Sequence, residues 1–174
     1  GLGDVYKRQT LGYSCSDDFV NVKSQAENSE DFFNSEDDYQ NALIGAYDLL
    51  QSSYINVMLG EIASDNTLAG GESATDVIGI QEIDDMIHTP VNAQLRDIWG
   101  WMFSGVNRAN YILEFKDKTD FTGKEQVLAQ ARFLRAYYYF ELVKWFGDVP
   151  LVVDQRILFG DQFNVDRTPK AQVY

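Results

Sequence analysis

The sequence predicts a mainly all-α fold, and three observations support this prediction. Apolar residues recur at helical spacing in three runs, over residues 35–50, 92–116 and 123–146. The third run ends at Gly147 and Pro150, which are residues that terminate helices. The 174 residues, of which 45% are hydrophobic, are enough for one domain with a buried core.

The net charge of −13 argues against two classes of partner. A chain this acidic cannot replace the counterions around nucleic-acid phosphates, so nucleic-acid binding is not expected. It is equally unsuited to binding an anionic membrane through surface charge. A single cysteine rules out an intramolecular disulfide, and no apolar run is long enough to cross a bilayer.

Residues 1–14 are expected to lie outside the fold. Asp4 to Gln9 are the residues that the codons GAT GTG TAT AAG AGA CAG would encode, and these bases resemble the end of a transposon-based sequencing adapter. The alternative is a natural polar N-terminus. Residues 11–15 then resemble the end of a lipoprotein signal peptide, in which Cys15 is the acylated residue. The alternative for Cys15 is an ordinary free thiol.

Residues 15–34 are polar and are interpreted as a tether, and the first helix follows it. Ser35 can cap this helix, and the carboxylates of residues 36–38 favour its positive end. Gly45 within it predicts close approach of another helix. The expected buried stripe consists of Tyr39, Ala42, Leu43, Ala46, Tyr47 and Leu50.

Residues 55–90 have the least regular pattern and are expected to form loops. Their polar side chains could bind the hydroxyl groups of a ligand or hold a calcium ion, although their spacing matches no EF-hand. Solvated loop carboxylates are the alternative. His88, the only histidine, is expected at a helix entrance. The candidate binding residues are Asp65, Asn66, Glu72 and Asp84, with Asp76 and Asp85 nearby.

The second long helix is expected over residues 92–116, where its apolar stripe predicts burial against the rest of the domain. Asn107 and Asn110 are three residues apart on one face. They are predicted to be buried amides that link helices or loops. The stripe consists of Leu95, Ile98, Trp99, Met102, Val106, Ala109, Ile112 and Leu113.

The third long helix is expected to pack on more than one side, because a second apolar row widens its buried stripe. Thr122 and Glu125 predict a capping box at its start. The short turn before it predicts an antiparallel hairpin with the preceding helix. Its stripe consists of Val127, Ala131, Leu134, Tyr138, Leu142 and Trp145. Its second row consists of Phe133, Tyr137 and Phe140.

After Pro150 the chain is expected to be extended as far as Val153 and then to form a polar loop. Thr168 and Pro169 predict the start of another helix, in which Thr168 is the cap and Pro169 takes the first turn. The sequence ends within one turn of that start. We therefore expect the chain to be the N-terminal part of a longer protein.

Several of these segments resemble the SusD/RagB family of nutrient-binding outer-membrane lipoproteins. The resemblance rests mainly on residues 131–140, ARFLRAYYYF, and residues 146–152, FGDVPLV. Further matches in the same order are residues 41–47, 60–66 and 106–113, with Trp99. Arg167 to Pro169, with Val173 and Tyr174, resembles the point where the next helix of the family begins.

The resemblance implies tetratricopeptide-like helical hairpins with long irregular loops on the ligand side. Residues 35–174 would be the truncated N-terminal part of such a helical domain. The implied function is non-catalytic capture of oligosaccharides at the cell surface, for delivery to a SusC-like TonB-dependent transporter. Cys15 would hold the protein on outer-membrane lipid, and the acidic pair after it resembles an export tag of the family. No cofactor or metal is implied.

Three alternatives remain open from the residues themselves. Peptide capture, as in the RagB side of the family, would rest on backbone contacts and acidic pockets. A glycoside hydrolase needs two facing carboxylates, and no spacing here selects a pair, so an enzyme is not expected. A helical-repeat interaction protein is the third.

No aromatic residue lies between Asn66 and Pro90. The aromatics expected in the core instead are Tyr137, Tyr138, Tyr139, Trp145 and Phe146.

Overall fold

The computed structural model describes residues 32–73, 75–157 and 166–174. The chain divides into two units, Gly1–Phe32 and Phe33–Tyr174, and all helices of the described residues lie in the second unit. Cys15 and the proposed segments 1–14 and most of 15–34 lie outside the described residues. The all-α prediction is confirmed, since one isolated bridge, between Val149 and Thr168, is the only β-pairing among the described residues.

The first part of this unit is one nearly continuous helical run. It comprises α1 (Glu36–Asp48), a 3₁₀ turn η3 (Leu49–Ser52) and α2 (Ser53–Ile62). Ser35 caps α1 as expected, in a reciprocal capping box with Asp38. The expectation of loops over residues 55–90 was wrong for the first eight residues, which belong to α2, and for Ile78–Asp84, which also form a helix. In α2, Ile55, Met58, Leu59 and Ile62 recur at helical spacing, and Gly60 is tolerated within the helix.

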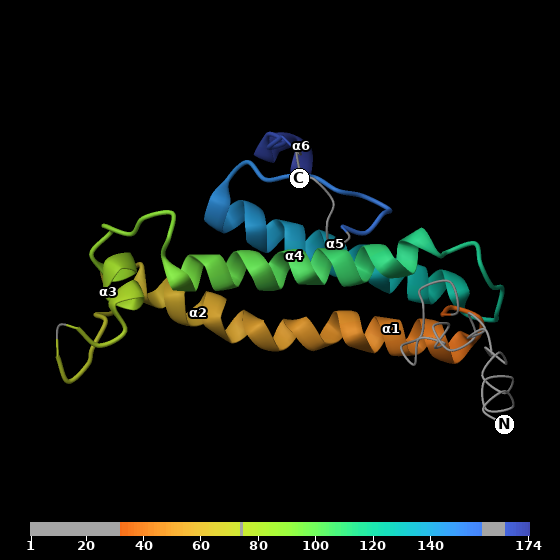
Figure 1. The fold of residues 1–174 in the computed structure, drawn as a ribbon, viewed down its shortest axis with the longest axis horizontal. Helices are drawn as coiled ribbons and strands as arrows, with labels where there is room; N and C mark the ends of the chain where they lie inside the picture. Colours follow the sequence, from red (N-terminus) through yellow and green to blue (C-terminus); the bar gives the residue numbers. More distant parts are fainter. Residues whose placement is uncertain (1–31, 74, 158–165) are drawn as a thin grey trace, which may run out of the picture. The chain divides into compact units, whose positions relative to one another are not determined.

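Three further helices complete the framework. They are the short α3 (Ile78–Asp84), α4 (Ala93–Glu114) and α5 (Lys124–Phe146). Helix α4 runs back along the α1–α2 run, and α5 returns antiparallel to α4, so the expected hairpin is confirmed (Figure 1). Helix α1 packs against both α4 and α5. The hairpin brings the end of α5 beside the start of α4.

Gly105 on α4, and not Gly45 on α1, lies against a side chain of another helix. A Cβ atom at Gly105 would lie 2.5 Å from a ring carbon of Tyr138, whereas a Cβ at Gly45 would meet nothing within 4 Å. The expectation for Gly45 was therefore wrong. Burial raises the pKa of Tyr138 to about 12. Its protonated hydroxyl donates to the carbonyl of Ala46, which joins α5 to α1.

A glycine with positive φ lies at each end of α5. Gly123, at φ 90°, is the N-cap, and no side chain caps the helix. The predicted capping box of Thr122 and Glu125 was wrong, because the helix begins one residue later than that motif requires. At the other end Gly147, at φ 68°, ends the helix as predicted.

Residues 148–157, here called the strap, cross the outside of the hairpin. Asn110 donates to the carbonyl of Val152 at 3.1 Å, and Asn107 exchanges two hydrogen bonds with the backbone of Ile157. The hydroxyl of Tyr139 accepts from the Val152 amide and donates to the carbonyl of the same residue. The prediction that both asparagines link helices to loops is confirmed.

The chain ends in the short helix α6 (Lys170–Val173). Its N-cap is Pro169, so the predicted capping role of Thr168 was wrong. Thr168 instead donates its amide to the carbonyl of Val149 in the isolated bridge. The carboxylate of Asp148 accepts from the amide of Lys170 at 2.8 Å and stabilises the first turn of α6.

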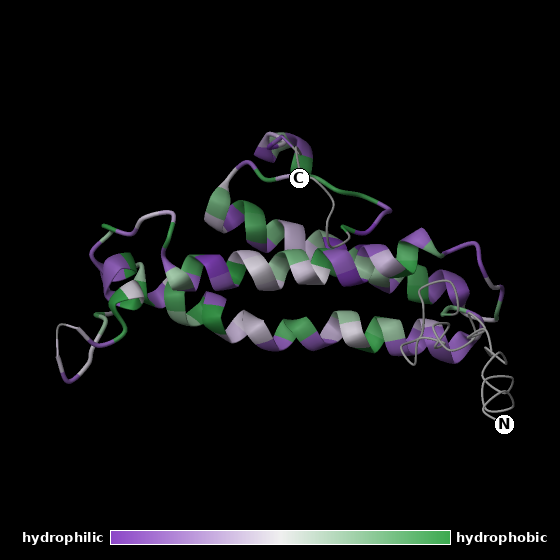
Figure 2. Cartoon of the chain, in the orientation of Figure 1, coloured by the Kyte–Doolittle hydropathy of each residue, from purple (hydrophilic) through white to green (hydrophobic). Residues whose placement is uncertain are grey.

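The second apolar row of α5 is largely exposed. Phe133 is 69% exposed and Phe140 is 46% exposed, whereas Leu134, Tyr138 and Leu142 are fully buried. Hydrophilic and hydrophobic residues are interspersed along each long helix (Figure 2). Within the described residues, no helix combines the length and apolar character that crossing a membrane requires.

Candidate ligand-binding site

The four candidate residues of the irregular region lie in or beside the loop between α2 and α3, and the structure does not bring them together. Asp65, Asn66 and Glu72 have exposed side chains. The carboxylate of Asp84, at the end of α3, accepts from the amide of Ala69 at 2.9 Å. No hydrogen bond joins any two of these four side chains in the part of the chain that the structure describes.

The neighbouring Asp76 shows what acidic residues do in this loop. Its carboxylate accepts from the amides of Glu72 and Ser73, and its side chain also contacts the hydroxyl of Ser73. Such bonds replace the secondary structure that the loop lacks. Within the described residues, no group of three or more His, Cys, Asp or Glu side chains could hold a metal ion.

A hollow of about 770 Å³ lies beside this loop, where five segments converge. We call it the loop-end hollow. This volume lies within the usual range for small-molecule sites. Its lining comes from the end of α2, from α3 and the loop after it, from the start of α4, from the end of α5 and from Arg167. The lining residues are Ala63, Ile83, Met86, His88, Thr89, Pro90, Leu95, Arg96, Trp99, Trp145, Phe146 and Arg167.

The aromatic wall of the loop-end hollow comes from both helices of the hairpin. The rings of Trp99 and Phe146 meet edge to face, with centroids 5.0 Å apart. Trp99 also contacts Phe103 at 4.7 Å, which fixes its position on α4. Trp99, Trp145 and Phe146 are half-buried, so each keeps part of its surface accessible from the hollow. Half-buried aromatic rings beside polar groups can stack against the C–H faces of a flat ligand.

The start of α4, which forms one side of the hollow, is held by a buried side chain. Asn92 caps α4 by accepting from the amides of Gln94 and Leu95. Its amide group donates to the carbonyl of Gly79 and to the carboxylate of Glu82, both on α3. Helix α3 and the start of α4 are therefore fixed relative to each other. This rigid support is what a preformed binding site needs.

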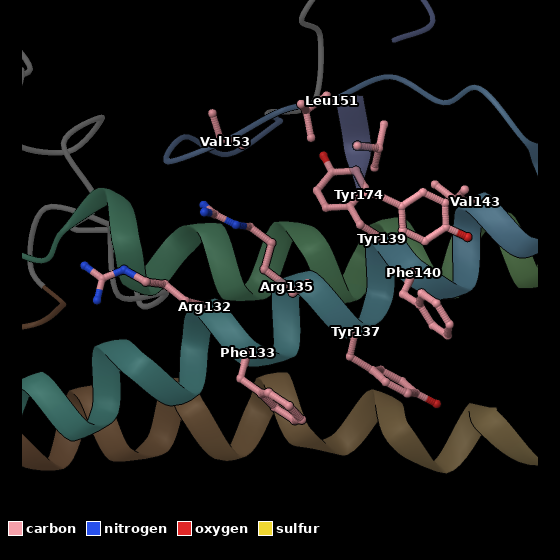
Figure 3. A pocket seen from close by; sticks show the side chains of 12 residues that line it. Arg132, Phe133, Arg135, Tyr137, Tyr139, Phe140, Val143, Leu151, Val153 and Tyr174 are labelled. Carbon is pink, nitrogen blue, oxygen red and sulfur yellow. The ribbon is translucent and has the colours of Figure 1, made fainter. Parts of the chain in front are cut away.

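A second hollow, of about 540 Å³, lies on the outer side of α5 (Figure 3). We call it the outer groove. Arg132, Phe133, Arg135, Tyr137 and Phe140 project from α5. Arg135 points towards Leu151 and Val153 of the strap, and the rings of Phe133 and Tyr137 point to the opposite side of α5. Tyr174 of α6 contacts Phe140, with ring centroids 6.0 Å apart. The groove is thus bounded by α5, the strap and α6.

An ion pair between Arg135 and Asp154 connects α5 to the strap at the outer groove. Arg135 donates to the carboxylate of Asp154 at 2.6 Å and to the side-chain oxygen of Asn110 at 3.1 Å. The hydrogen bond from Arg135 holds the pKa of Asp154 below its usual value. Burial raises the pKa of Tyr137, and the nearby charge of Glu141 adds to this effect. Within residues 32–73, 75–157 and 166–174, no pair of facing carboxylates lines either hollow.

The aromatic wall is the feature that sequence reasoning missed. Trp145 and Phe146 were predicted to be core residues, and the structure places them half-buried at the edge of a hollow. A usable signal was present in the sequence. An antiparallel hairpin brings the end of its second helix beside the start of its first, so Trp145 and Phe146 had to lie near Trp99.

Comparisons with known proteins agree with this architecture. A SusD-like family model, described as starch-binding and associating with the outer membrane, matches residues 18–174. Two SusD-like proteins of Formosa agariphila are 28% identical over 141 residues and 27% identical over 146 residues. These matches cover 74% and 83% of this chain, but only 27% and 28% of the two relatives.

A solved structure gives a similar result. The surface glycan-binding protein A from Bacteroides uniformis matches with a TM-score of 0.69 and 27% sequence identity. The match covers 80% of this chain and 32% of that protein. The chain therefore spans about a third or less of the length of the relatives that it matches.

Proposed function

The chain belongs to the family of SusD-like proteins, and on that premise we propose that it is part of a non-catalytic surface protein that binds oligosaccharides. In this proposal the captured oligosaccharide passes to a SusC-like TonB-dependent transporter in the outer membrane. Residues 35–174 form the N-terminal part of the binding domain, residues 15–34 form the tether, and residues 1–14 are not part of the fold.

The observation that carries this proposal is the loop-end hollow. It places the rings of Trp99, Trp145 and Phe146 beside polar groups at the irregular end of the helices. Sugar rings present flat C–H surfaces that stack on aromatic rings, and hydroxyl groups that need planar polar partners. We propose that Asp65, Asn66, Glu72 and Asp84 supply polar contacts on the loop side of a longer bound chain.

The absence of a catalytic role is also part of the proposal. Hydrolysis of a glycosidic bond needs an acid and a second carboxylate about 5 to 9 Å apart, on opposite sides of the bond. Among the residues that the structure describes, the lining of the loop-end hollow contains aromatic, aliphatic, hydroxyl, imidazole and guanidinium groups, but no carboxylate. Binding without cleavage is what this set of groups supports.

Binding is tested by titrating the purified chain with a panel of oligosaccharides and recording tryptophan fluorescence and heat. We expect at least one oligosaccharide to bind and to change the fluorescence. Trp145→Ala should weaken its binding about fivefold or more, because stacking on an indole ring contributes about 1 kcal/mol or more. Trp101→Ala is the matched control, because Trp101 lies on α4 but does not line the hollow. The proposal would be contradicted if peptides bound to the chain and no oligosaccharide did.

Anchoring is tested separately. We propose that Cys15 carries the lipid that holds the protein on the outer membrane. Fatty-acid labelling in an expressing bacterium with lipoprotein processing should mark the chain preceded by its signal peptide. Cys15→Ala should remove both the label and the membrane association. An unchanged label in Cys15→Ala would exclude this residue as the anchor.

A further inference from the structure

The charged residues of the loop-end hollow all have the same sign. The hollow is lined by Arg96 and Arg167, with His88 and Thr89 as further polar residues, and none of the described residues that line it is acidic. The chain as a whole carries 27 acidic residues and 14 basic ones. The described lining of the hollow is therefore basic, whereas the chain as a whole is acidic. Arginine is also the side chain best suited to bind a carboxylate or sulfate through two parallel hydrogen bonds.

Arg96 lies beside an indole ring of the hollow. Arg96 and Trp99 are three residues apart on α4, so they share one face of the helix. Both line the hollow, so a ring stacked on Trp99 would present its substituents to Arg96. The partner of Arg96 in the structure is Asp97, at 3.6 Å, and both side chains are well exposed. An ion pair this long and exposed contributes little and can be replaced by a bound anion.

Arg167 reaches the hollow from another part of the chain. Its neighbour Thr168 is paired with Val149 through a backbone hydrogen bond of 2.9 Å. This pairing fixes Arg167 close to the end of α5, where Trp145 and Phe146 lie. In the described part of the chain, no carboxylate lies within ion-pair distance of Arg167. The hollow thus has an aromatic wall, with one guanidinium group from α4 and another from the segment after the strap.

We propose that the loop-end hollow is a subsite for an anionic sugar unit, whose ring stacks on the indoles and whose carboxylate or sulfate binds Arg96 and Arg167. This proposal rests on the proposed function and names its class of ligand. A neutral sugar would leave both guanidinium groups solvated and would gain only the stacking. An acidic unit gains charge-assisted hydrogen bonds as well. The same groups would disfavour a cationic ligand.

The experiment compares tetragalacturonate with its fully methyl-esterified form, which has the same rings without the charge. The background variant is Trp101→Phe, because the chain has three tryptophans and this change leaves only Trp99 and Trp145 as reporters. At low salt we expect the acid to bind about tenfold more tightly than the ester, with a change in fluorescence. The preference should decrease as salt is added. A sulfated galactan tetrasaccharide is the second arm, and it distinguishes sulfate from carboxylate.

The double variant Arg96→Gln/Arg167→Gln should bind the acid and the ester equally. Arg132→Gln is the matched control, because Arg132 is an exposed arginine in the outer groove, and it should keep the preference. Circular dichroism melts of all variants establish that they are folded. Equal affinity for acid, sulfate and ester in the unmodified chain would overturn the proposal. So would a preference that survives in the double variant.

The failure of this inference is distinguishable from the failure of the proposed function. If the ester or neutral maltotetraose binds with a fluorescence change, and neither anionic probe binds more tightly, oligosaccharide binding stands and the anionic subsite falls. If no oligosaccharide of either kind binds, both proposals fall.

Discussion

The inner and outer faces of α5 carry similar residues but differ in what covers them. On the inner face, Leu134, Tyr138 and Leu142 are fully buried against α4 and α1. On the outer face, Phe133 and Phe140 remain exposed beside the outer groove (Figure 3). Both rows have helical spacing and strongly apolar side chains. The periodicity of a helix therefore shows which residues share a face, but not whether another element covers that face.

Close contacts explain why the inner face of α5 packs in a defined way against α4 and α1. Gly105 allows α4 to approach the ring of Tyr138, and the Tyr138 hydroxyl reaches the backbone of α1. Three helices are thus tied together by one side chain. The outer face has no comparable fit in the described residues, since the strap and α6 only border it. Variants on the two faces should therefore differ strongly in their effect on stability.

The largest expected difference is between two neighbouring residues. Leu134→Ala should lower the free energy of unfolding by about 2–5 kcal/mol, because it removes buried methyl groups and leaves a cavity. Phe133→Ala should change it by less than about 0.5 kcal/mol, because the ring is 69% exposed. Urea denaturation monitored by circular dichroism measures both. Equal losses in the two variants would show that the outer face is covered in solution.

The next effect tests the close approach of the hairpin. Gly105→Ala should destabilise the protein by about 1–3 kcal/mol, because the added methyl group would overlap the Tyr138 ring. Gly100→Ala on the same helix is the control, since nothing lies within 4 Å of a Cβ there. That control should be stabilising by about 0.5–1 kcal/mol, because alanine favours helix. Thermal melts of both variants provide the measurement. A Gly105→Ala variant as stable as the unmodified chain would contradict the close packing of Gly105 against Tyr138.

The smallest effect concerns the ion pair at the edge of the outer groove. Arg135 holds the pKa of Asp154 below its ordinary value of 3.8. The stabilisation is therefore complete at neutral pH, and it is lost as the pH falls below about 3.8 through the folded-state pKa. It should amount to less than about 1 kcal/mol, because the carboxylate is half exposed.

Asp154→Asn isolates this contribution. Asp154 has φ 57°, and asparagine tolerates that conformation as well as aspartate does. The variant should be slightly less stable than the unmodified chain at pH 7 and equally stable near pH 2. Denaturation curves at the two pH values compare them. A stability difference that is the same at both would show that the ion pair does not contribute.

The candidate site was predicted less completely than the helices. Asp65, Asn66, Glu72 and Asp84 were chosen because polar residues in a long loop can bind ligands. The structure places them in or beside that loop without joining them. The loop-end hollow depends on Trp99, Trp145 and Arg167, which come from three separate segments. No local pattern connects residues so far apart in the sequence, so the hollow could be found only after the hairpin was built.

The sequence by itself determined the helices, the ends marked by Ser35, Gly147 and Pro150, the hairpin, and the linking roles of Asn107 and Asn110. These features depend on periodicity, backbone conformation and short-range hydrogen bonds, which a few neighbouring residues specify. Only the tertiary structure decided which apolar face of α5 is covered, which glycine allows close packing, and where aromatic and cationic side chains meet. Those outcomes depend on contacts between distant segments, and a local pattern does not encode which segments will meet.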